Sequence, residues 1–164
     1  MAESALKIRM AAESDRARVG AIISAAGIFT DDEVASAMDL VDQSFSHPAR
    51  GEYLVAVAEE SGCVWGYVCY GPTPLTDGVY DLYWIAVDPA RQRQGFGQFL
   101  LRYVESEVRK RGGRMLLIET SSKKSYAPTL RFYTMAGYEE ISRIKDFYRV
   151  QDDKLVFCKY LTVG

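Results

Sequence analysis

The chain has 164 residues, a length typical of one domain, and the 48% that are hydrophobic offer enough apolar surface for a core, which argues against a disordered chain. No apolar run approaches the roughly 18 residues of a membrane-spanning helix, and residues 1–10 lack the basic and then apolar organisation of a secretory signal, so we expect a cytoplasmic protein without a membrane partner. The net charge of −2 gives little support for nucleic-acid binding. The two halves differ in charge, with −8 in residues 1–82 (5 Lys and Arg, 13 Asp and Glu) and +6 in residues 83–164 (15 Lys and Arg, 9 Asp and Glu).

Strand and helix signals follow one another along the whole chain. In order, we expect a strand at 5–10, helices starting near Ser14 and at Asp31, strands at 52–60, 63–71 and 79–87, a helix at 95–111, a strand at 115–120, a helix at 127–135, and strands at 138–145 and 154–161. The hydroxyl of Ser14 can cap the first helix, and Ser61-Gly62 is a hairpin turn. This order predicts one domain over residues 1–164, of mixed α/β (α+β) class, with a central sheet of about seven strands flanked by about four helices.

The sharpest local feature is a basic, glycine-containing turn between the strand at 79–87 and the helix that follows it. A helix N-terminus presents unpaired amides and the positive end of the helix dipole. Gly95 and Gly97 have no Cβ, so phosphate oxygens can approach the main chain, and Arg91 and Arg93 add positive charge. We interpret the turn as a pyrophosphate cradle; the alternative is a tight strand-to-helix turn in which the glycines serve packing alone.

Two familiar phosphate-binding motifs are excluded. The chain has no GxxxxGK[ST] run, and the third glycine of a GxGxxG fingerprint is replaced by Leu100. Instead, Gln92-x-x-Gly95-x-Gly97 resembles the [QR]xxGx[GA] motif of the GNAT N-acetyltransferase superfamily, and the element order matches that family over nearly the whole chain. The resemblance implies a GNAT-type fold and acetyl-CoA (coenzyme A) as cofactor.

By this resemblance, main-chain groups of one strand pair with the pantetheine arm and those of the following turn hold the pyrophosphate. The implied cofactor-binding residues are Ile85, Ala86, Val87, Gln92, Arg93, Gln94, Gly95, Phe96, Gly97 and Gln98. Many relatives carry Asn seven residues before the catalytic tyrosine, where this chain has Tyr126, and Thr129 stands where a small Ala is common. Tyr126 or Ser125 is therefore expected to hold the cofactor arm in a different way.

Transfer of an acetyl group to an amine needs a base for the ammonium and an acid for the departing thiolate. The segment Phe132-Tyr133-x-x-x-Gly137-Tyr138 resembles the family's FYxxxGF segment, which implies that Tyr133 is the acid. Glu119 ends an apolar strand and resembles the glutamate of ribosomal-protein alanine N-acetyltransferases, which makes it the candidate base. The alternatives are a packing role for Tyr133 and a simple ion pair with Lys or Arg for Glu119.

The acceptor groove is expected among aromatic-rich segments near Tyr83, Trp84, Phe147 and Tyr148. Residues 144–148 resemble the aromatic loop between the last two strands of N-terminal acetyltransferases. Asp81 is a candidate anchor for a cationic amine, as are Glu52 and Asp77. Aromatic residues on antiparallel strands equally often only pack, and that interpretation stays open.

The sequence therefore favours an acetyl-CoA-dependent N-acetyltransferase that acts on the amine of a peptide, protein or small molecule. The alternative is a non-catalytic acetyl-CoA-binding sensor or interaction module; a nucleic-acid binder, suggested by Arg109-Lys110-Arg111, is less favoured because that cluster also complements the end of a helix. Three scattered cysteines and the single His47 make a poor ligand set, so we expect no metal and reduced, packed thiols. A homodimer stays open.

Overall fold

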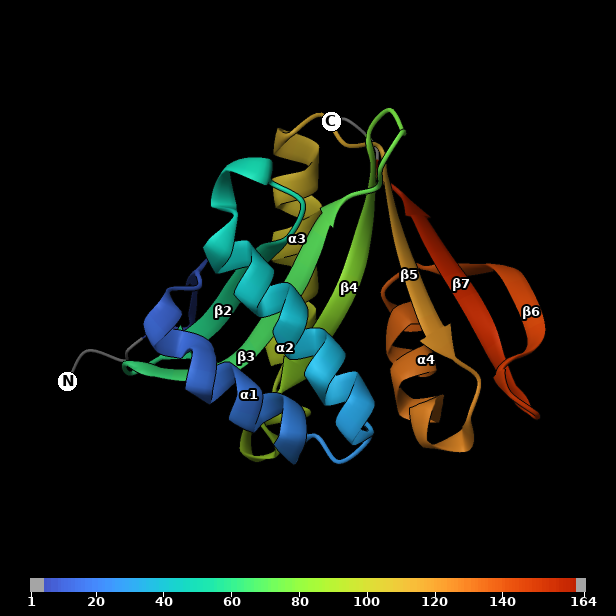
Figure 1. Ribbon diagram of the computed structural model, residues 1–164, viewed down its shortest axis with the longest axis horizontal. Helices are drawn as coiled ribbons and strands as arrows, with labels where there is room; N and C mark the ends of the chain where they lie inside the picture. Colours follow the sequence, from blue (N-terminus) through green and yellow to red (C-terminus); the bar gives the residue numbers. More distant parts are fainter. Residues whose placement is uncertain (1–4, 162–164) are drawn as a thin grey trace.

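The computed structural model, which describes residues 5–161, contains one seven-stranded sheet (Figure 1). The strands are β1 (Lys7–Met10), β2 (Leu54–Glu60), β3 (Cys63–Pro72), β4 (Val79–Val87), β5 (Met115–Ser121), β6 (Glu139–Arg149) and β7 (Asp152–Tyr160). Their order across the sheet is β1-β2-β3-β4-β5-β7-β6. All neighbours pair antiparallel except β4 and β5, which are parallel. The predicted mixed sheet and α/β class are confirmed.

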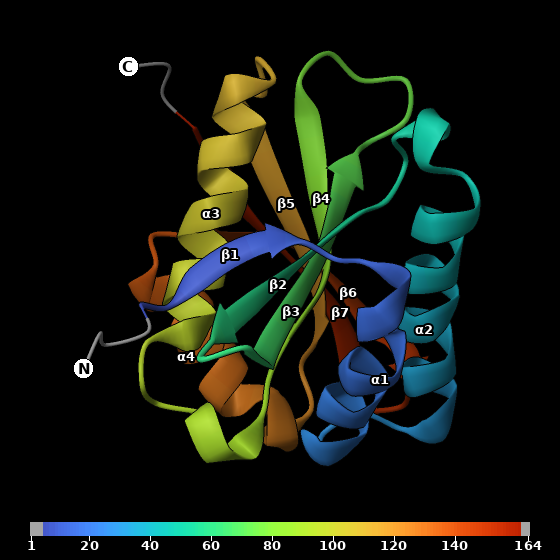
Figure 2. The ribbon, with the colours of Figure 1, turned by 90° about the vertical axis from the view of Figure 1, so that its left-hand side faces the viewer.

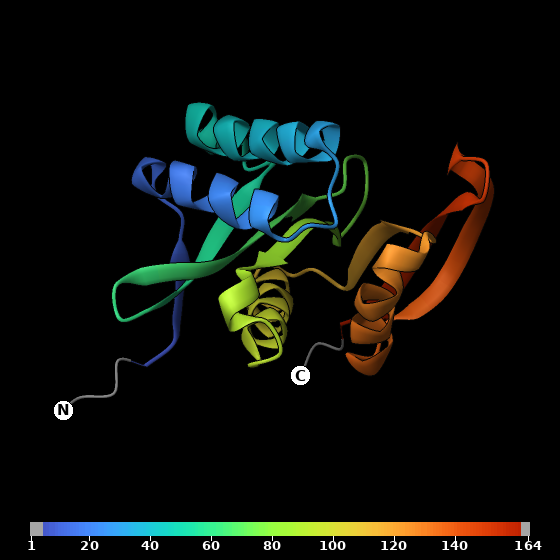
Figure 3. The ribbon, with the colours of Figure 1, turned by 90° about the horizontal axis from the view of Figure 1, so that it is seen from below.

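Four α-helices cover the two faces of this sheet. They are α1 (Arg16–Ala25), α2 (Asp31–Ser46), α3 (Phe96–Lys110) and α4 (Ala127–Met135), with short 3₁₀ turns at Glu13–Asp15, Pro48–Arg50, Pro89–Arg91 and Lys124–Tyr126. Helices α1 and α2 lie on one face, and α3 lies on the other (Figure 2). Seen from below, α4 lies on the same side as α3, and the β6–β7 hairpin extends away from the helices (Figure 3). None of the described helices is long and apolar enough to cross a membrane.

Each face of the sheet has its own apolar cluster. On the α3 face, Leu100, Val104 and Val108 are fully buried against sheet residues. They recur every four residues, so one stripe of the helix faces the sheet, and each buried side chain of this size contributes roughly 1.5–3 kcal/mol. On the opposite face, Val19, Ile22 and other side chains of α1 and α2 pack on β2, β3 and β4. The two clusters hold β4 between helices of opposite faces.

The parallel pair β4–β5 separates partway along its length. The ladder joins Val79 to Met115 and ends at Leu82 and Ile118, although both strands continue. Figure 1 shows them side by side at one end and diverging toward the other. On the other edge of β4, the pairing with β3 shifts register after Cys69, so that Tyr83 is the extra residue of a bulge. The sheet therefore opens at its middle, beside a bulged strand.

Three sequence-based expectations need correction. Helix α1 begins at Arg16 and is capped by Asp15 without a side-chain bond, while Ser14 lies in the preceding 3₁₀ turn, so the predicted Ser14 cap is wrong. Residues 144–148, expected as a loop, belong to β6, and the turn to β7 comes only at 150–151. Among the three free thiols, Cys69 and Cys158 are buried, but Cys63 is exposed and is not a packing residue.

Candidate functional site

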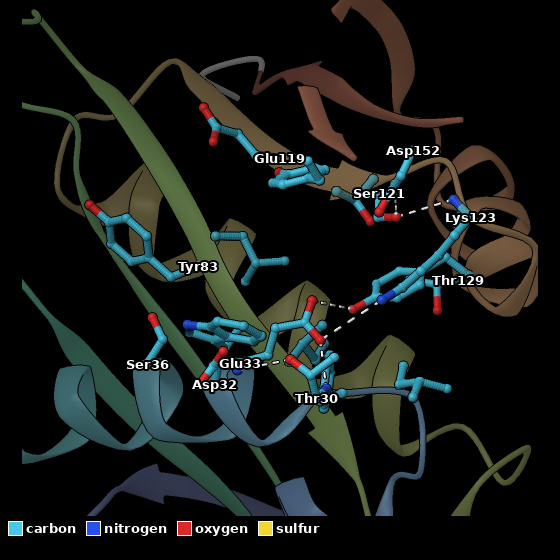
Figure 4. A pocket seen from close by; sticks show the side chains of 18 of the residues that line it. Thr30, Asp32, Glu33, Ser36, Tyr83, Glu119, Ser121, Lys123, Thr129 and Asp152 are labelled. Carbon is cyan, nitrogen blue, oxygen red and sulfur yellow. Dashed lines mark hydrogen bonds and ion pairs between the residues drawn. The ribbon is translucent and has the colours of Figure 1, made fainter. Parts of the chain in front are cut away.

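A cavity of about 650 Å³ occupies the opening between β4 and β5 (Figure 4). It is lined by residues from the α1–α2 loop, one face of α2, β4, β5, the start of α4 and the β6–β7 hairpin. The cavity lies within the size range of small-molecule sites, and its lining mixes aromatic, apolar and charged side chains. Because its walls come from both separated halves of the sheet, the splitting of the parallel pair creates the site.

Eight of the site residues predicted from the sequence line this cavity. They are Asp81, Tyr83, Trp84, Ile85, Glu119, Tyr126 and Tyr133, together with Tyr148 from the hairpin. Phe147 does not line the cavity: it is 51% exposed, and the ammonium of Lys154 lies 5.0 Å from its ring centre. Glu52 and Asp77 are also outside the lining. The structure thus separates Phe147 from its neighbour Tyr148.

The glycine-containing turn lies at the end of β4 and has the backbone geometry of a cradle. Gly95 caps α3 with φ 87°, a left-handed conformation that favours glycine, and a Cβ placed there would find open space within 4 Å. Phe99 donates its amide to the Gly95 carbonyl at 2.9 Å, so the amides of Phe96, Gly97 and Gln98 form the first turn of the helix. Residues present here therefore fit an anionic group such as a pyrophosphate.

Two glutamine side chains of the turn stabilise it by hydrogen bonds to main-chain carbonyls. The side-chain amide of Gln92 donates to the Val87 carbonyl at 3.2 Å, and that of Gln94 donates to the Ala90 carbonyl at 3.1 Å. Gly97 also has a packing role, because a Cβ there would contact Phe132 at 3.5 Å. Because the side-chain amides of Gln92 and Gln94 already donate within the turn, the main-chain amides are the groups that remain for binding a ligand.

The two arginines of the turn differ. Arg91 pairs with Glu60 at 2.9 Å and stacks over the ring of Trp65 at 4.7 Å, so much of its charge is compensated within the protein. Arg93 is exposed and has φ 60°. Its guanidinium is the freer source of positive charge beside the amides of α3.

Tyr133 combines burial with access to the cavity. It is 5% exposed, lines the cavity from α4, and packs against Phe132, Tyr138 and Phe157 with ring centres 5.5–6.2 Å apart. Burial raises the pKa of the phenol above its usual value of 10, so the hydroxyl is protonated at neutral pH. Within residues 5–161, the structure gives this hydroxyl no hydrogen-bond partner. It is a proton donor without a bound acceptor.

Glu119 and Asp81 line the cavity and provide two of its carboxylates. Glu119 follows Ile118, the last residue of β5 that pairs with β4. Its side chain is 53% exposed and pairs with Lys154 at 2.8 Å. Asp81 is partly buried and accepts a bond from the Thr73 hydroxyl at 2.7 Å. Desolvation raises the pKa of Asp81, and the charge of Glu119 raises it further. The alternative expected for Glu119, an ion pair with Lys or Arg, is present as the pair with Lys154, and Glu119 nevertheless lines the cavity.

Tyr126 links the two halves of the site. Its hydroxyl donates to Glu33 on α2 at 3.3 Å, and the ammonium of Lys123 lies 4.9 Å from its ring centre and 3.9 Å from Glu33 (Figure 4). Burial raises the pKa of Tyr126 above its usual value, so it also acts as a donor. This contact bounds the cavity on the side where α4 begins.

The sequence did not reveal the contribution of the α1–α2 loop and of α2. These elements add seven lining residues, namely Ile28, Phe29, Thr30, Asp32, Glu33, Ser36 and Leu40. The Thr30 hydroxyl accepts from the Glu33 amide at 3.2 Å while the Glu33 carboxylate accepts from the Thr30 amide at 2.7 Å. This Thr-x-x-Glu capping box is readable in the sequence, and the spacing of Asp32, Ser36 and Leu40 marks one helix face. Neither signal says that this face borders a cavity.

Comparison with known proteins agrees with this geometry. The model of the acetyltransferase (GNAT) family matches residues 21–138. The [ribosomal protein bS18]-alanine N-acetyltransferase of Escherichia coli is 36% identical over 73 residues, which are 44% of this chain and 48% of that protein. The chain thus matches about half the length of the curated relatives.

Solved structures extend the likeness to nearly the whole chain. A protein from Desulfovibrio desulfuricans assigned to the GNAT family is 43% identical, with a TM-score of 0.93 over 96% of this chain and 100% of that one. A protein from Salmonella typhimurium, solved with its cofactor acetyl-CoA, has the same fold at 22% identity, with a TM-score of 0.75 over 97% and 95% of the chains. The chain belongs to the acetyltransferase (GNAT) family.

Proposed function

We propose that this protein transfers the acetyl group of acetyl-CoA to a primary amine, and that the N-terminal amine of a peptide or protein is favoured over a small-molecule amine. The observation that carries this proposal is the meeting of a protonated, unbonded Tyr133 hydroxyl and the Glu119 carboxylate in one cavity at the end of the parallel ladder. The likeness to bS18-alanine N-acetyltransferases supports a peptide acceptor.

Binding of the acyl donor is assigned to the main chain. Amides of the first turn of α3, from Phe96 to Gln98, hold the pyrophosphate, with Arg93 beside them. The edge of β4 beyond Leu82, where β5 has separated, holds the pantetheine arm. Acetyl-CoA supplies the activated thioester carbonyl. Positioning of this kind can contribute several kcal/mol to the rate, because it removes the entropy cost of bringing two reactants together.

Two side chains manage the protons. The Glu119 carboxylate takes a proton from the incoming ammonium, directly or through water, and leaves a neutral amine as nucleophile. The Tyr133 hydroxyl donates its proton to the sulfur that departs, and the second proton, which the nitrogen loses as the amide forms, returns to the phenolate directly or through water. Its raised pKa keeps this proton in place until negative charge develops nearby. Each contribution is typically worth about 10²–10⁴-fold in rate.

The test measures thiol release from acetyl-CoA with a panel of peptides and small amines. Tyr133→Phe should lower kcat by about 10²-fold or more and leave acetyl-CoA affinity nearly unchanged, because only the proton is lost. Tyr160→Phe is the matched control, since Tyr160 is 70% exposed on β7 and outside the cavity. Glu119→Gln should also lower kcat, whereas Glu140→Gln, which removes an exposed carboxylate with an ion pair of its own, should not. Acetyl-CoA binding without turnover of any amine would instead favour a non-catalytic binding module.

A further inference from the structure

Resting on the proposed acetyl transfer, we propose that the acceptor carries a second positive charge, separate from the amine that is acetylated, which is held by the carboxylates of Asp81 and Asp32. This assigns a specificity role to two residues of the cavity. The shared chemistry is a primary amine with a cationic group nearby, as in a peptide whose second residue is basic or in a small diamine.

The cavity has an excess of negative charge. Its lining contains five carboxylates, Asp32, Glu33, Asp81, Glu119 and Asp152, and two cationic side chains, Lys123 and Arg149. The attraction between charges is stronger in a cavity partly screened from water, because the dielectric constant there is lower than in bulk water. A neutral acceptor gains nothing from this field, and an anionic one is repelled.

Three of these carboxylates already have partners. Glu33 accepts bonds from Thr30 and Tyr126. Asp152 accepts the hydroxyl hydrogen of Ser121. Glu119 pairs with Lys154. Lys123 at 3.9 Å and Lys154 at 2.8 Å compensate the charges of Glu33 and Glu119. Asp152 bonds only a hydroxyl, as Asp81 does, so its charge adds to the negative field that an acceptor meets.

Neither Asp81 nor Asp32 forms an ion pair within the described residues, although the charge of Lys154, which pairs with Glu119, also acts on Asp81. Asp81 has the Thr73 hydroxyl as its bonding partner, although it is partly buried at the floor of the cavity. Desolvation of an unpaired carboxylate is costly, and its raised pKa is a sign of this cost, which an incoming cation offsets. Asp32 lies in the first turn of α2 with its side chain facing the cavity, near Ser36 (Figure 4).

An independent feature of the same cavity also indicates a ligand. Tyr133 is 5% exposed as a residue and lines the cavity, and its hydroxyl has no hydrogen-bond partner within residues 5–161. A phenol in such a position is normally hydrogen-bonded, so a bound molecule is expected to approach it. The rings of Tyr83, Trp84 and Tyr148 also line the cavity and offer faces on which a cation can rest.

The test compares acceptors that differ by one charge. One pair of peptides has Lys or norleucine as the second residue, and a second pair consists of 1,5-diaminopentane and pentylamine. We expect kcat/KM to be at least tenfold higher for the charged member of a pair at low salt, with the ratio falling as salt is added. The peptide pair and the amine pair distinguish the two sources of the charge.

Substitutions assign the effect to the two residues. Asp81→Asn and Asp32→Asn should each bring the ratio toward one, because kcat/KM falls more for the charged member of a pair than for the neutral member. Asn at position 81 can still accept the Thr73 bond. Asp31→Asn is the matched control, because Asp31 lies in the same helical turn and carries the same charge but does not line the cavity; it should keep the ratio of the unmodified protein.

The outcomes separate this inference from the proposed function. If neutral and charged acceptors are acetylated equally well, the inference fails and the acetyl transfer stands. If no amine is acetylated, the proposed function fails, and calorimetric binding of the two peptides in the presence of coenzyme A still decides the inference. Equal dissociation constants would overturn it. Thermal unfolding of each variant shows that it is folded, and if Asp81→Asn is not, Asp32→Asn and the acceptor pairs are sufficient.

Discussion

Gly95 and Gly97 belong to one motif, yet the structure predicts different consequences for replacing each by alanine. At Gly95, the left-handed φ of 87° costs an alanine about 1–2 kcal/mol, offset by less than about 1 kcal/mol from the stiffer unfolded chain. A net loss of about 1 kcal/mol corresponds to a fall in Tm of about 2–4 °C for a chain of this size. The new Cβ would also stand in the open space beside the α3 amides, where a phosphate would approach.

Gly97→Ala serves as the matched control within the same turn. Its Cβ would contact Phe132 at 3.5 Å and Val87 at 3.9 Å, which are ordinary packing distances inside the protein. Alanine is favoured over glycine inside a helix by up to about 1 kcal/mol, so Tm should stay unchanged or rise. We expect acetyl-CoA affinity to fall at least tenfold, about 1.4 kcal/mol, for Gly95→Ala and less than about threefold for Gly97→Ala.

Two measurements check this pair of predictions, namely calorimetric Kd for acetyl-CoA and Tm from thermal unfolding. Unchanged affinity in Gly95→Ala would mean that the diphosphate is not held at this turn. An unchanged Tm in the same variant would mean that the left-handed backbone at Gly95 is not imposed by the fold. A loss of affinity in Gly97→Ala equal to that in Gly95→Ala would show that both positions contact the ligand.

Three further predictions concern buried polar groups. Lys159→Met removes the ammonium 2.9 Å from the buried Glu105 carboxylate and should cost about 1–3 kcal/mol, read as a lower urea midpoint. Asp15→Asn should destabilise the protein at pH 7, because bonds from Arg9 at 2.7 and 3.0 Å lower the pKa of this carboxyl. The difference in stability from the unmodified protein should begin to shrink below pH about 4, where the unfolded carboxyl takes up its proton, and should be lost below the lowered pKa of the folded one; a constant difference would contradict the argument. Because the pKa of Tyr133 is raised above 10, kcat should not fall through loss of its proton as pH rises from 8 to 10; a fall that disappears in Tyr133→Phe would show that the phenol ionises there.

Elements with a buried face were predictable from local patterns. Strand β4 and helix α4 begin and end at the predicted residues, because β4 is rich in β-branched and aromatic residues and α4 has Pro128 in its first turn and Gly137 after its end. The glycine turn was also found correctly, since its backbone conformation needs glycine at Gly95. In these segments, the same residues that set the local conformation also carry the signal.

Strand β6 was predicted too short for a physical reason. Every residue of β6 is exposed, so the strand has no buried face and no apolar alternation to mark its extent. Its far end is held by pairing with β7 and by local polar bonds instead. The Asp146 amide donates to Asp153 at 2.9 Å, and the Asp146 carboxylate accepts from the Gln151 amide at 2.7 Å. Such tertiary and local side-chain bonds are invisible to periodicity.

The candidate site was only half predictable. Tyr133 and Glu119 were found because motif and strand position marked them, and both line the cavity. Phe147 was placed there because residues 144–148 resemble an aromatic loop, but they lie in a strand, where successive residues point to opposite faces, so Phe147 and Tyr148 point apart. The face of α2 was missed because its polar residues are equally typical of a solvated helix surface.

The split between β4 and β5 connects the stability of the fold with its capacity to bind. The parallel ladder ends at Leu82 and Ile118, although β4 continues to Val87, so the edge of β4 facing the opening lacks β5 as a pairing partner there. Backbone amides and carbonyls in such a position are normally satisfied by another chain or a ligand. A pantetheine arm contains two amides and can add to this edge as a strand-like partner. The break in the ladder therefore both opens the cavity and leaves main-chain groups of β4 without β5 as a partner, and these are the groups that we propose bind the arm, while α3 and the α1–α2 layer hold β4 in place from its two faces. A sequence pattern that specifies β4 as a strand does not show where its neighbour leaves it, and this is why the binding edge emerges only from the assembled sheet.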